Sequence, residues 1–539
     1  MHKPILFLLS LSSVTAEVRP LLGLIPTVVG EQVQPLSLNA AALQGWKTKN
    51  VDVSRPPGEH LGFKTVRLSS RPRQSFLQVE IPFTQNQIIA ERFGFWFKGD
   101  NSNRDLILSY SQPGSETEHR LTNVKLNFGA WRHFEIPASN PIHRFHGKSG
   151  SFRIRINGAL PTGTEIQIGN LELVTSKLVQ QSVVKKEIPA PIFDTWGGPA
   201  RKQIEAGKKG GVNMHISPIH FFDRPDIKER VAYPSKAVRW CRELGLLSGI
   251  SFYNHPSKEW IKANRELLVQ RHDGEVYTGG GAFTSPWNPK ALELWRAHII
   301  ECLQEMKKNG SLQNVDVVEL CPGEEGEVSY QWDHVWAFDE HAVNAWHEYL
   351  RTLYKNDINK LNDDWASTHK AFDEIEPHHG YYPDRAHWVF TDFYRLSMLK
   401  YCVFQADAVR EVFTPRYWLW LPHSLPSYPK RFFAGRYPLF YAENLNRLGC
   451  MDYGHLSALD WHARADVAHI QQNNVRVLGE IDVRPTQQRL EWTFEQSKKY
   501  KMDGVFIGVL EIHSKDGAFT PLGELSRKLI RNWPPVCAE

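Results

Sequence analysis

Cysteine is sparse in this sequence, and its spacing excludes two common ways of stabilising a small domain. The six cysteines among 539 residues stand far apart, and no two of them form a C-x-x-C pair. Neither a cysteine zinc cluster nor a dense disulfide framework is therefore expected. We expect most of these side chains to be buried thiols, and one or two long-range disulfides stay open.

Long apolar runs are absent after the N-terminal segment. No later run approaches the roughly 20 residues of a membrane-spanning helix. The leading run, Ile5 to Leu11, follows Lys3 and precedes the small-residue site Val14-Thr15-Ala16. This order is typical of a secretory signal peptide, so residues 1–16 are expected to be removed. The mature protein is expected to be soluble, without a membrane span, and secreted or periplasmic.

A strong excess of one charge is also absent, because the formal net charge is only +5. The whole surplus lies in residues 17–175, where lysine and arginine outnumber aspartate and glutamate. Nucleic-acid binders carry far more positive charge, so no nucleic-acid partner is expected. A mildly basic first domain would suit an acidic polymer, and simple solubility explains the charge equally well.

Motifs for metals and phosphates are missing as well. The histidines at the predicted strand ends show no two-His helical motif, and Gly323-x-x-Gly326 lacks the Lys and Ser or Thr of a phosphate-binding loop. We therefore expect no metal and no cofactor.

Short alternating segments fill the first third of the chain. Six short β-patterned runs, most of which alternate apolar and polar residues, stand between Gly, Pro, Asn and Ser signals: Phe76–Ile81, Phe93–Lys98, Leu106–Tyr110, Ala130–Ile136, Phe152–Ile156 and Ile166–Leu173. This pattern predicts a β-sandwich of the jelly-roll kind over residues 17–175, followed by a polar linker over residues 176–190. A glycan-binding and a purely structural role for the sandwich are equally open.

From residue 191 to 539 the texture changes, because apolar strand-like runs now alternate with helical patterns such as Ala291–Lys307 and Asp392–Val412. The eight predicted strands are Pro191–Trp196, Val212–Ile219, Leu247–Tyr253, Val315–Leu320, Tyr417–Leu421, Leu448–Tyr453, Val475–Leu478 and Val505–Leu510. Eight continuous apolar strands separated by helices predict a (β/α)8 TIM barrel, with an open doubly wound sheet as the alternative.

Two acidic segments each follow one of these strands. Residues 321–327 (Cys-Pro-Gly-Glu-Glu-Gly-Glu) follow the fourth strand, and Glu480 ends the seventh. A carboxylate at the end of a buried strand is costly to desolvate unless it has a task there. Two carboxylates facing one cleft are what glycosidic bond cleavage requires, since one protonates the leaving oxygen and the other attacks the sugar or activates water.

These positions resemble the clan-A (4/7 superfamily) glycoside hydrolases, and the most similar family is the family 42 β-galactosidases. Residues 345–354 and Ile358–Trp365 resemble that family's helix and following turn, and Gly323–Tyr330 resembles the acid-bearing loop of β-amylases. The resemblance implies that Glu327 is the general acid/base and Glu480 the nucleophile of a retaining enzyme. Gly326 replaces the family's usual Asn, so Glu324 and Glu325 stay open as alternatives to Glu327.

Further polar and aromatic residues at predicted strand ends and in loops are candidates for substrate binding: Asp194, Trp196, His215, His220, Asn254, His255, Trp287, Glu324, His423, His455 and Arg484. Several basic residues are expected near the cleft mouth: Arg271, His272, His423, Lys430, Arg431, Arg436 and Arg484. They suit a sulfated or carboxylated galactan of the carrageenan or agar type. Pairing with nearby acids such as Asp273 and Glu443 is the equally open alternative.

The sequence thus predicts a secreted enzyme that cleaves a β-linked galactan, with a polysaccharide or oligosaccharide as its partner. A noncatalytic glycan-binding protein on a barrel scaffold is one alternative, and an inverting glycosidase of β-amylase type is another. The separation of the two carboxyl groups distinguishes retention, at roughly 5 Å, from inversion, at about 6.5 to 9.5 Å. The oligomeric state is not predicted.

Overall fold

The computed structural model divides the chain into two compact units. Unit 1 comprises Met1–Val179 and Trp346–Phe393, and unit 2 comprises Gln180–Ala345 and Tyr394–Glu539. The structure describes residues 32–35, 46–54, 59–60, 63–71, 76–84, 89–111, 118–137, 149–158, 165–176, 187–197, 200–224, 226–252, 256–277, 283–320, 323, 327–328, 330, 334–379, 384–421, 438–457, 467, 470–471, 474–481, 486–508 and 517–534. The predicted signal peptide, residues 1–16, and most of the predicted linker lie outside them.

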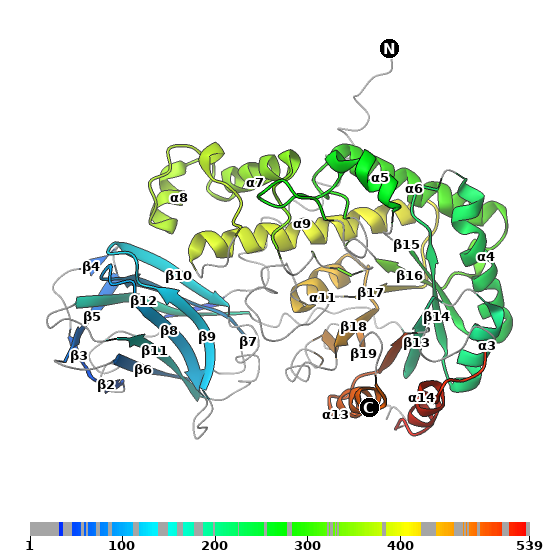
Figure 1. Ribbon diagram of the computed structural model, residues 1–539, viewed down its shortest axis with the longest axis horizontal. Helices are drawn as coiled ribbons and strands as arrows, with labels where there is room; N and C mark the ends of the chain where they lie inside the picture. Colours follow the sequence, from blue (N-terminus) through cyan, green and yellow to red (C-terminus); the bar gives the residue numbers. More distant parts are fainter. Residues whose placement is uncertain are drawn as a thin grey trace, which may run out of the picture. The chain divides into compact units, whose positions relative to one another are not determined.

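Unit 1 contains two antiparallel sheets, which confirms the predicted β-sandwich (Figure 1). One sheet has the order β10-β7-β12-β5-β3, with β1 on β12 and β4 on β5; the other has the order β2-β6-β11-β8-β9. The strands are β1 (Gln32–Pro35), β2 (Lys47–Lys49), β3 (Val51–Ser54), β4 (Glu59–His60), β5 (Phe63–Ser70), β6 (Phe76–Thr84), β7 (Ile89–Lys98), β8 (Asp105–Ser111), β9 (Glu118–Lys125), β10 (Trp131–Pro137), β11 (Ser149–Asn157) and β12 (Glu165–Ser176).

Alternation along the strands builds the sandwich core. Val79 of β6 and Ile154 of β11 are fully buried, and they share one apolar cluster with Phe95 and Phe97 of β7. Successive strand residues point to opposite faces, so the residues between these, such as Glu80 and Arg153, lie on the outer face of their sheet.

A segment far along the chain belongs to the same unit as the sandwich. Within residues 346–393, helix α8 (Ile358–Trp365) contacts β10, and Asp384 forms a bridge with Phe134 of that strand. Trp96 and His133 lie on the outer face of this sheet, yet they are only 4% and 9% exposed. The outer face of this sheet is therefore covered at these two residues.

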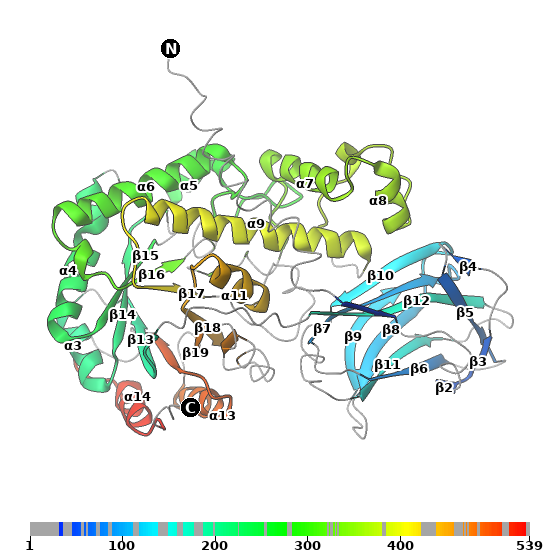
Figure 2. The same ribbon diagram turned by 180° about the vertical axis from the view of Figure 1, so that it is seen from behind.

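Unit 2 contains a closed barrel of eight parallel strands, β13 to β20 in chain order, which confirms the predicted TIM barrel and excludes the open sheet (Figure 2). The strands are β13 (Ile192–Trp196), β14 (Met214–Ile219), β15 (Leu247–Phe252), β16 (Val317–Leu320), β17 (Tyr417–Trp420), β18 (Tyr453–Ser457), β19 (Arg476–Glu480) and β20 (Gly504–Gly508).

The barrel interior is filled by residues of every second strand position. Met214, Val317, Leu419 and Leu478, from four different strands, belong to one apolar cluster built from the barrel strands and Ile188. Because side chains alternate, residues an even number of positions away on each strand also face the interior. Only side chains on this interior face can reach a cleft at the end of the barrel.

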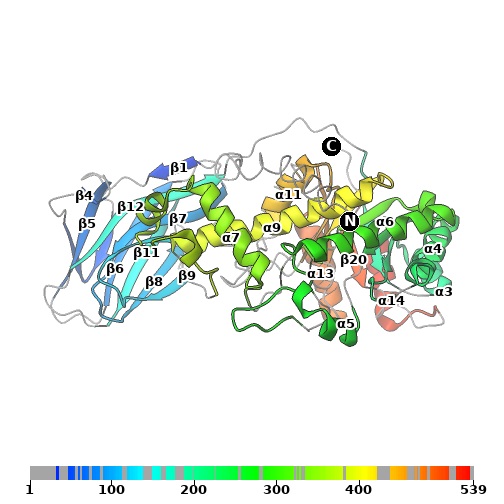
Figure 3. The ribbon, with the colours of Figure 1, turned by 90° about the horizontal axis from the view of Figure 1, so that it is seen from above.

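Helices separate the strands, and α4 and α6 lie side by side outside the barrel (Figure 3). Their ends follow capping chemistry: Asp226 and Asn288 accept first-turn N–H bonds, and Gly245 (φ 68°) ends α4 in the left-handed region. The helices are α3 (Arg201–Gly210), α4 (Ile227–Leu244), α5 (Lys258–Ala263), α6 (Pro289–Lys308), α7 (Glu340–Leu353), α9 (Arg385–Arg410), α11 (Pro438–Arg447), α13 (Gln487–Lys499) and α14 (Pro521–Arg531). Short 3₁₀ turns are η1 (Arg265–Leu267), η2 (Leu312–Asn314) and η4 (Phe372–Glu374).

The sixth barrel strand was predicted too early. Residues 448–452 form the turn after α11, because Gly449 takes a left-handed conformation (φ 70°) and Cys450 N–H bonds back to Leu445 O. The strand begins only at Tyr453. His455, expected after this strand, is therefore its third residue.

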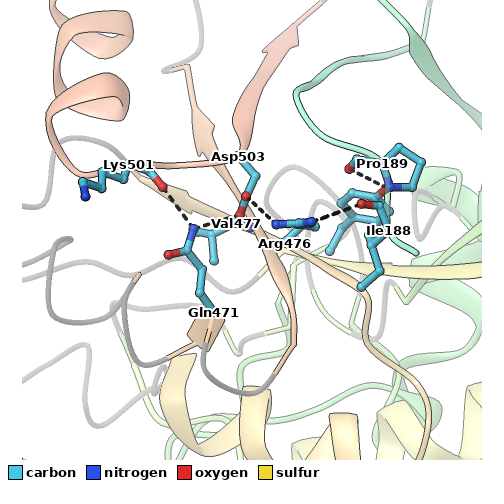
Figure 4. Close-up of polar contacts among 8 residues, drawn as sticks. Ile188, Pro189, Gln471, Arg476, Val477, Lys501 and Asp503 are labelled. Carbon is cyan, nitrogen blue, oxygen red and sulfur yellow. Dashed lines mark hydrogen bonds and ion pairs between the residues drawn. The ribbon is translucent and has the colours of Figure 1, made fainter. Parts of the chain in front are cut away.

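Residues at the end of the predicted linker anchor the N-terminal end of the barrel. Arg476 Nη1 donates to Asp503 Oδ1 at 3.1 Å, and its Nε donates to Ile188 O at 3.3 Å (Figure 4). Tyr453 Oη donates to Pro189 O at 3.2 Å. A cavity of about 420 Å³ lies at this end, lined in part by Pro189 and Asp316, on the side of the barrel opposite the strand ends that carry the candidate acids.

Four cysteines lie among the described residues, and all four are buried free thiols: Cys241, Cys302, Cys402 and Cys450. This confirms the expectation of buried thiols for these four, and Cys321 and Cys537 lie outside the described residues. Within the described part of the chain, no helix combines the length and apolar character needed to cross a membrane.

Candidate active site

Glu480 is the last residue of β19, at the C-terminal end of the barrel. Leu478, two residues earlier, belongs to the interior cluster, so Glu480 lies on the interior face of the strand. Its strand neighbours at the same level are Ser457 of β18 and Phe506 of β20. The half-buried carboxylate therefore stands on the barrel rim where active sites of this fold occur.

Glu327 stands in the loop after β16, at the same end of the barrel. Its carbonyl oxygen accepts an N–H bond from Gly323 at 2.9 Å. The next residue, Val328, is fully buried and donates its N–H to Leu421 O, just past β17, at 2.9 Å. These bonds fix the half-buried Glu327 next to the ends of two strands. Glu324 and Glu325 lie outside the described residues.

A third glutamate, Glu319, was missed by sequence reasoning. It is only 4% exposed and sits in β16 between Val318 and Leu320. Val317 belongs to the interior cluster, so Glu319 faces the barrel interior as well. The available signal was a charged residue inside an otherwise apolar strand, which is expensive unless the carboxylate has partners.

Asp194 and His455 form a buried pair across the barrel interior. His455 Nε2 lies 3.0 Å from Asp194 Oδ2, and both side chains are 0% exposed. The imidazole also stacks on Phe506, with ring centroids 4.4 Å apart. Asp194 was predicted to bind substrate from a strand end, but it is the third residue of β13 and fully buried. Both residues therefore form the floor of the site, below the rim glutamates.

Electrostatics keep a proton on this pair. Burial alone would lower the pKa of His455, but the hydrogen bond and charge of Asp194, together with the charges of Glu319 and Glu480, raise it above its usual 6.5. Burial raises the pKa of Asp194, which the bond to His455 only partly opposes. Both shifts favour a proton held by the pair, next to the carboxyl groups of Glu319 and Glu480.

Two other predicted substrate residues lie at the ends of neighbouring strands. Trp196 ends β13, and its indole Nε1 donates to Ser251 Oγ of β15 at 3.3 Å. His220 directly follows β14 and is half-buried, and this burial lowers its pKa. Their positions on the C-terminal rim are compatible with contact to a bound ligand.

His215 was predicted to bind substrate, but it does not face the cleft. It alternates with Met214 and Ile216 of the interior cluster, so its ring lies on the outer side of β14. Its Nδ1 is 2.9 Å from Thr195 Oγ1, and its Nε2 is 3.4 Å from the Tyr233 hydroxyl of α4. Burial lowers its pKa to about 4, so it is a neutral, hydrogen-bonded residue between barrel and helix layer.

Trp287, predicted as part of a loop over the cleft, belongs to an internal aromatic stack. Its ring lies nearly parallel to those of Tyr330 and Tyr394, with centroids 5.9 and 6.3 Å away. Its Nε1 donates to Ser397 Oγ of α9 at 2.9 Å. Trp287 is thus held by packing, and only part of its surface is exposed.

The remaining predicted binding residues lie outside the described residues: Asn254, His255, Glu324, His423 and Arg484. His423 and Arg484 also belong to the basic residues expected at the mouth, and three more of that set lie outside the described residues: Lys430, Arg431 and Arg436. Arg271 pairs with Asp273, its Nε donating to Oδ1 at 2.7 Å, which is the alternative left open for it. Among the described residues, no group of three His, Cys, Asp or Glu could hold a metal ion.

No protein-family model and no curated protein sequence matches this chain. Solved structures do resemble it. The catalytic domain of a β-amylase from Paenibacillus polymyxa aligns with a TM-score of 0.53 and 15% identity, over 65% of this chain and 100% of its own. At this identity the likeness shows a shared barrel fold.

Two further structures align less well. A GH42 β-galactosidase from G. stearothermophilus aligns with a TM-score of 0.47 and 11% identity, over 66% of this chain and 58% of its own. An exo-β-agarase aligns with a TM-score of 0.39 and 8% identity, over 90% of this chain and 97% of its own.

Proposed function

We propose that this protein is a glycoside hydrolase that cleaves a β-linked glycan. The observation that carries the proposal is the position of two glutamates, Glu327 after β16 and Glu480 at the end of β19, on one rim of a closed eight-stranded barrel. Paired carboxylates at this rim are the minimal machinery for hydrolysing a glycosidic bond. The buried Glu319, Asp194 and His455 beneath them supply a charged floor that a packing role alone does not require.

In the proposed mechanism Glu480 attacks the anomeric carbon while Glu327 protonates the departing oxygen. Glu327 then removes a proton from water, which releases the sugar from Glu480 with retained configuration. The charge of Glu480 favours a proton on His455, and by the same interaction a protonated His455 favours the carboxylate form of Glu480, which a nucleophile needs. Trp196 and His220 are proposed to contact the sugar, as are the predicted residues outside the described part of the chain.

We propose a galactan as the substrate on the basis of the sequence resemblance around residues 323–365. A screen of neutral and sulfated plant and algal polysaccharides, with product sizing, tests the activity. The anomer released first, observed by proton NMR, tests the stereochemistry. Release of the inverted anomer would support the inverting alternative instead of the retaining one.

Substitution of the two rim glutamates tests their roles. Glu480→Gln and Glu327→Gln each keep the shape of the side chain but remove its charge or proton, so each should lower kcat by about 100-fold or more. Circular dichroism and thermal unfolding should stay at wild-type values. The matched control is Glu293→Gln, an exposed position on α6, which should retain full activity.

The same variants separate an enzyme from a noncatalytic binder. If Glu327→Gln alone stays active, Glu324 or Glu325 becomes the candidate acid. If no polysaccharide is cleaved but both variants still bind one, the protein is a glycan-binding scaffold. We also propose export through residues 1–16, which predicts that the secreted protein begins at Glu17.

A further inference from the structure

The outer face of the five-stranded sheet in unit 1 carries a cluster of cations. Leu77 and Val79 of β6 and Ile154 of β11 point into the sandwich core. The residues that alternate with them therefore point outward, away from the core. We call the outward residues Lys47, Lys49, Phe76, Gln78, Arg153 and Arg155 the basic face.

Strand register arranges these residues in rows across the sheet. Lys49 of β2 stands opposite Gln78 of β6, which stands opposite Arg155 of β11. The next row runs from Lys47 through Glu80 to Arg153. Directly opposed residues lie roughly 5 Å apart, so each row forms a continuous polar track across three strands.

The acid on this face is already engaged. Glu80 accepts a hydrogen bond from Arg153 Nη2 at 3.3 Å and lies 3.8 Å from Lys47 Nζ. Burial would raise the pKa of Glu80, but bonds from Ser151 and Arg153 and the two positive charges lower it, so Glu80 is ionised. Lys47 and Arg153 thus neutralise the charge of Glu80. Glu80 therefore does not neutralise the cations of the neighbouring row, Lys49 and Arg155.

Lys49 and Arg155 share one aromatic ring. Lys49 Nζ lies 5.4 Å and the Arg155 guanidinium carbon 4.3 Å from the centroid of Phe76. Arg155 Nε donates to Asn157 Oδ1 at 2.9 Å, and neither cation forms an ion pair with a described residue. Both cations lie near the same ring, so they repel each other, and an anion bound next to them would lower this repulsion.

The two sheets differ in how accessible their outer faces are. On the seven-stranded sheet, the outward Trp96 and His133 are almost fully buried. On the five-stranded sheet, Lys47 and Lys49 are exposed, and Phe76, Gln78 and Arg155 are partly exposed. The basic face is therefore open to a ligand along its rows.

We propose that the basic face binds an anionic polysaccharide, with Lys49 and Arg155 holding a sulfate or carboxylate group and Phe76 packing against a sugar ring. Gln78 and Asn157 offer amide groups to the hydroxyls of the same sugar. The aromatic ring suits the apolar face of a sugar ring, and the cations next to it suit the anionic groups of a charged sugar chain. Nucleic acid is disfavoured, because the face offers too few cations to neutralise a closely spaced row of phosphates.

This site deepens the proposed function, since it assigns a charged substrate class to the proposed glycanase. It is tested by binding, in full-length protein that carries Glu480→Gln so that the polymer stays intact. The probes are dextran sulfate against dextran, and a sulfated galactan against agarose, by affinity electrophoresis at low and moderate salt. We expect the sulfated member of each pair to bind more tightly, and salt to weaken that binding.

Variants locate the site. Lys49→Ala with Arg155→Ala should weaken binding of the sulfated probes by about tenfold or more, since each loses a charge-assisted contact. Phe76→Ala should weaken it as well, and Arg155→Lys should retain part of it. The matched control is Lys125→Ala in the same sheet, because Lys125 is already paired with Asp105 at 2.9 Å.

Two results would overturn the site: unchanged binding in the double variant, or duplex DNA bound as tightly as dextran sulfate. Thermal unfolding of each variant shows whether the sandwich is intact, and Arg155→Lys provides a second test if the double variant unfolds. Hydrolysis of short oligosaccharides by the otherwise wild-type double variant should be unchanged. Absence of any hydrolysis would contradict the proposed enzymatic activity. It would not affect the conclusion drawn from the binding measurements.

Discussion

At the scale of single residues, the pair of Asp194 and His455 links the electrostatics of the barrel to its proposed chemistry. Neither side chain is exposed, and three carboxylates act on the one imidazole. A cation is tolerated in such a place only because the surrounding negative charge offsets its desolvation. The proton held by the pair should therefore contribute to both stability and activity.

Stability should fall as the pH rises above neutrality. The pKa of His455 is raised in the folded protein, so its contribution is fully present below the unfolded value of 6.5 and is lost as the pH rises through the folded value. Urea unfolding of the wild type and of His455→Gln between pH 6 and 9 measures this. The wild-type midpoint should decline with pH, and that of the variant should decline less; parallel curves would contradict the assignment.

His215 is the matched control, with the opposite sign. Its pKa is lowered to about 4, so the folded protein resists its protonation and loses stability as the pH falls from 6.5 toward 4. His215→Gln should make this acid-side decline shallower and leave the alkaline side unchanged. The pH profile of any glycosidase activity should likewise shift in His455→Gln and not in His215→Gln.

At the scale of elements, β19 places Glu480 because of the residue before it. Gly479 faces the helix layer, where an added Cβ would lie 2.0 Å from Ser497 Oγ of α13 and 3.1 Å from Met502 Sδ. Only a residue without a side chain lets β19 and α13 approach this closely. The glycine therefore determines where the rim carboxylate stands.

Gly479→Ala should push β19 and α13 apart and destabilise the protein by about 1–3 kcal/mol, as overpacking does. Because Glu480 moves with the strand, activity should fall more than binding. Adding Ser497→Ala removes the nearest clash and should restore part of both losses, whereas Ser497→Ala alone should be nearly neutral. Thermal unfolding and kinetics of the three variants decide this, and an unaltered Gly479→Ala protein would refute the packing argument.

At the scale of the whole molecule, the long connection between β16 and β17 serves two units. Residues 346–393 group with the sandwich, where α8 contacts β10 and Asp384 bridges to Phe134. The Tyr354 hydroxyl donates to Asp364 Oδ2 at 2.6 Å, and Arg385 Nε donates to the same oxygen at 2.9 Å, so hydrogen bonds join three separate positions of this segment. Residues 346–393 thus fold together with the sandwich as one compact unit.

A chain that begins at Lys186 should therefore be less stable than the full-length protein. Its residues 346–393 would lose their β10 contacts and expose apolar surface. We expect a lower unfolding temperature and a loss of activity on short and long substrates alike. Supplying residues 17–179 as a separate chain should restore both; a truncated chain as stable as the full-length protein would contradict this expectation.

Sequence alone determined the architecture and the two rim glutamates. Period-two alternation in segments such as Phe152–Ile156 and eight apolar runs separated by helices are local patterns, and each is set by which faces of a strand are buried. Strands with weaker patterns, such as Phe63–Ser70 and Glu118–Lys125, were missed because few of their residues are apolar. The strand-end position of Glu480 was predicted correctly, and the catalytic roles stay predictions.

Tertiary structure alone decided how the polar residues are combined. Asp194 and His455 are 261 positions apart in the chain, and barrel closure brings them together with Glu319 into one buried charged group. The same closure turns His215 outward, because a shift of one residue along a strand changes its face. Sequence patterns specify which residues a strand buries, but only the closed barrel specifies which buried charges meet, since desolvated charges are stable solely in one another's presence.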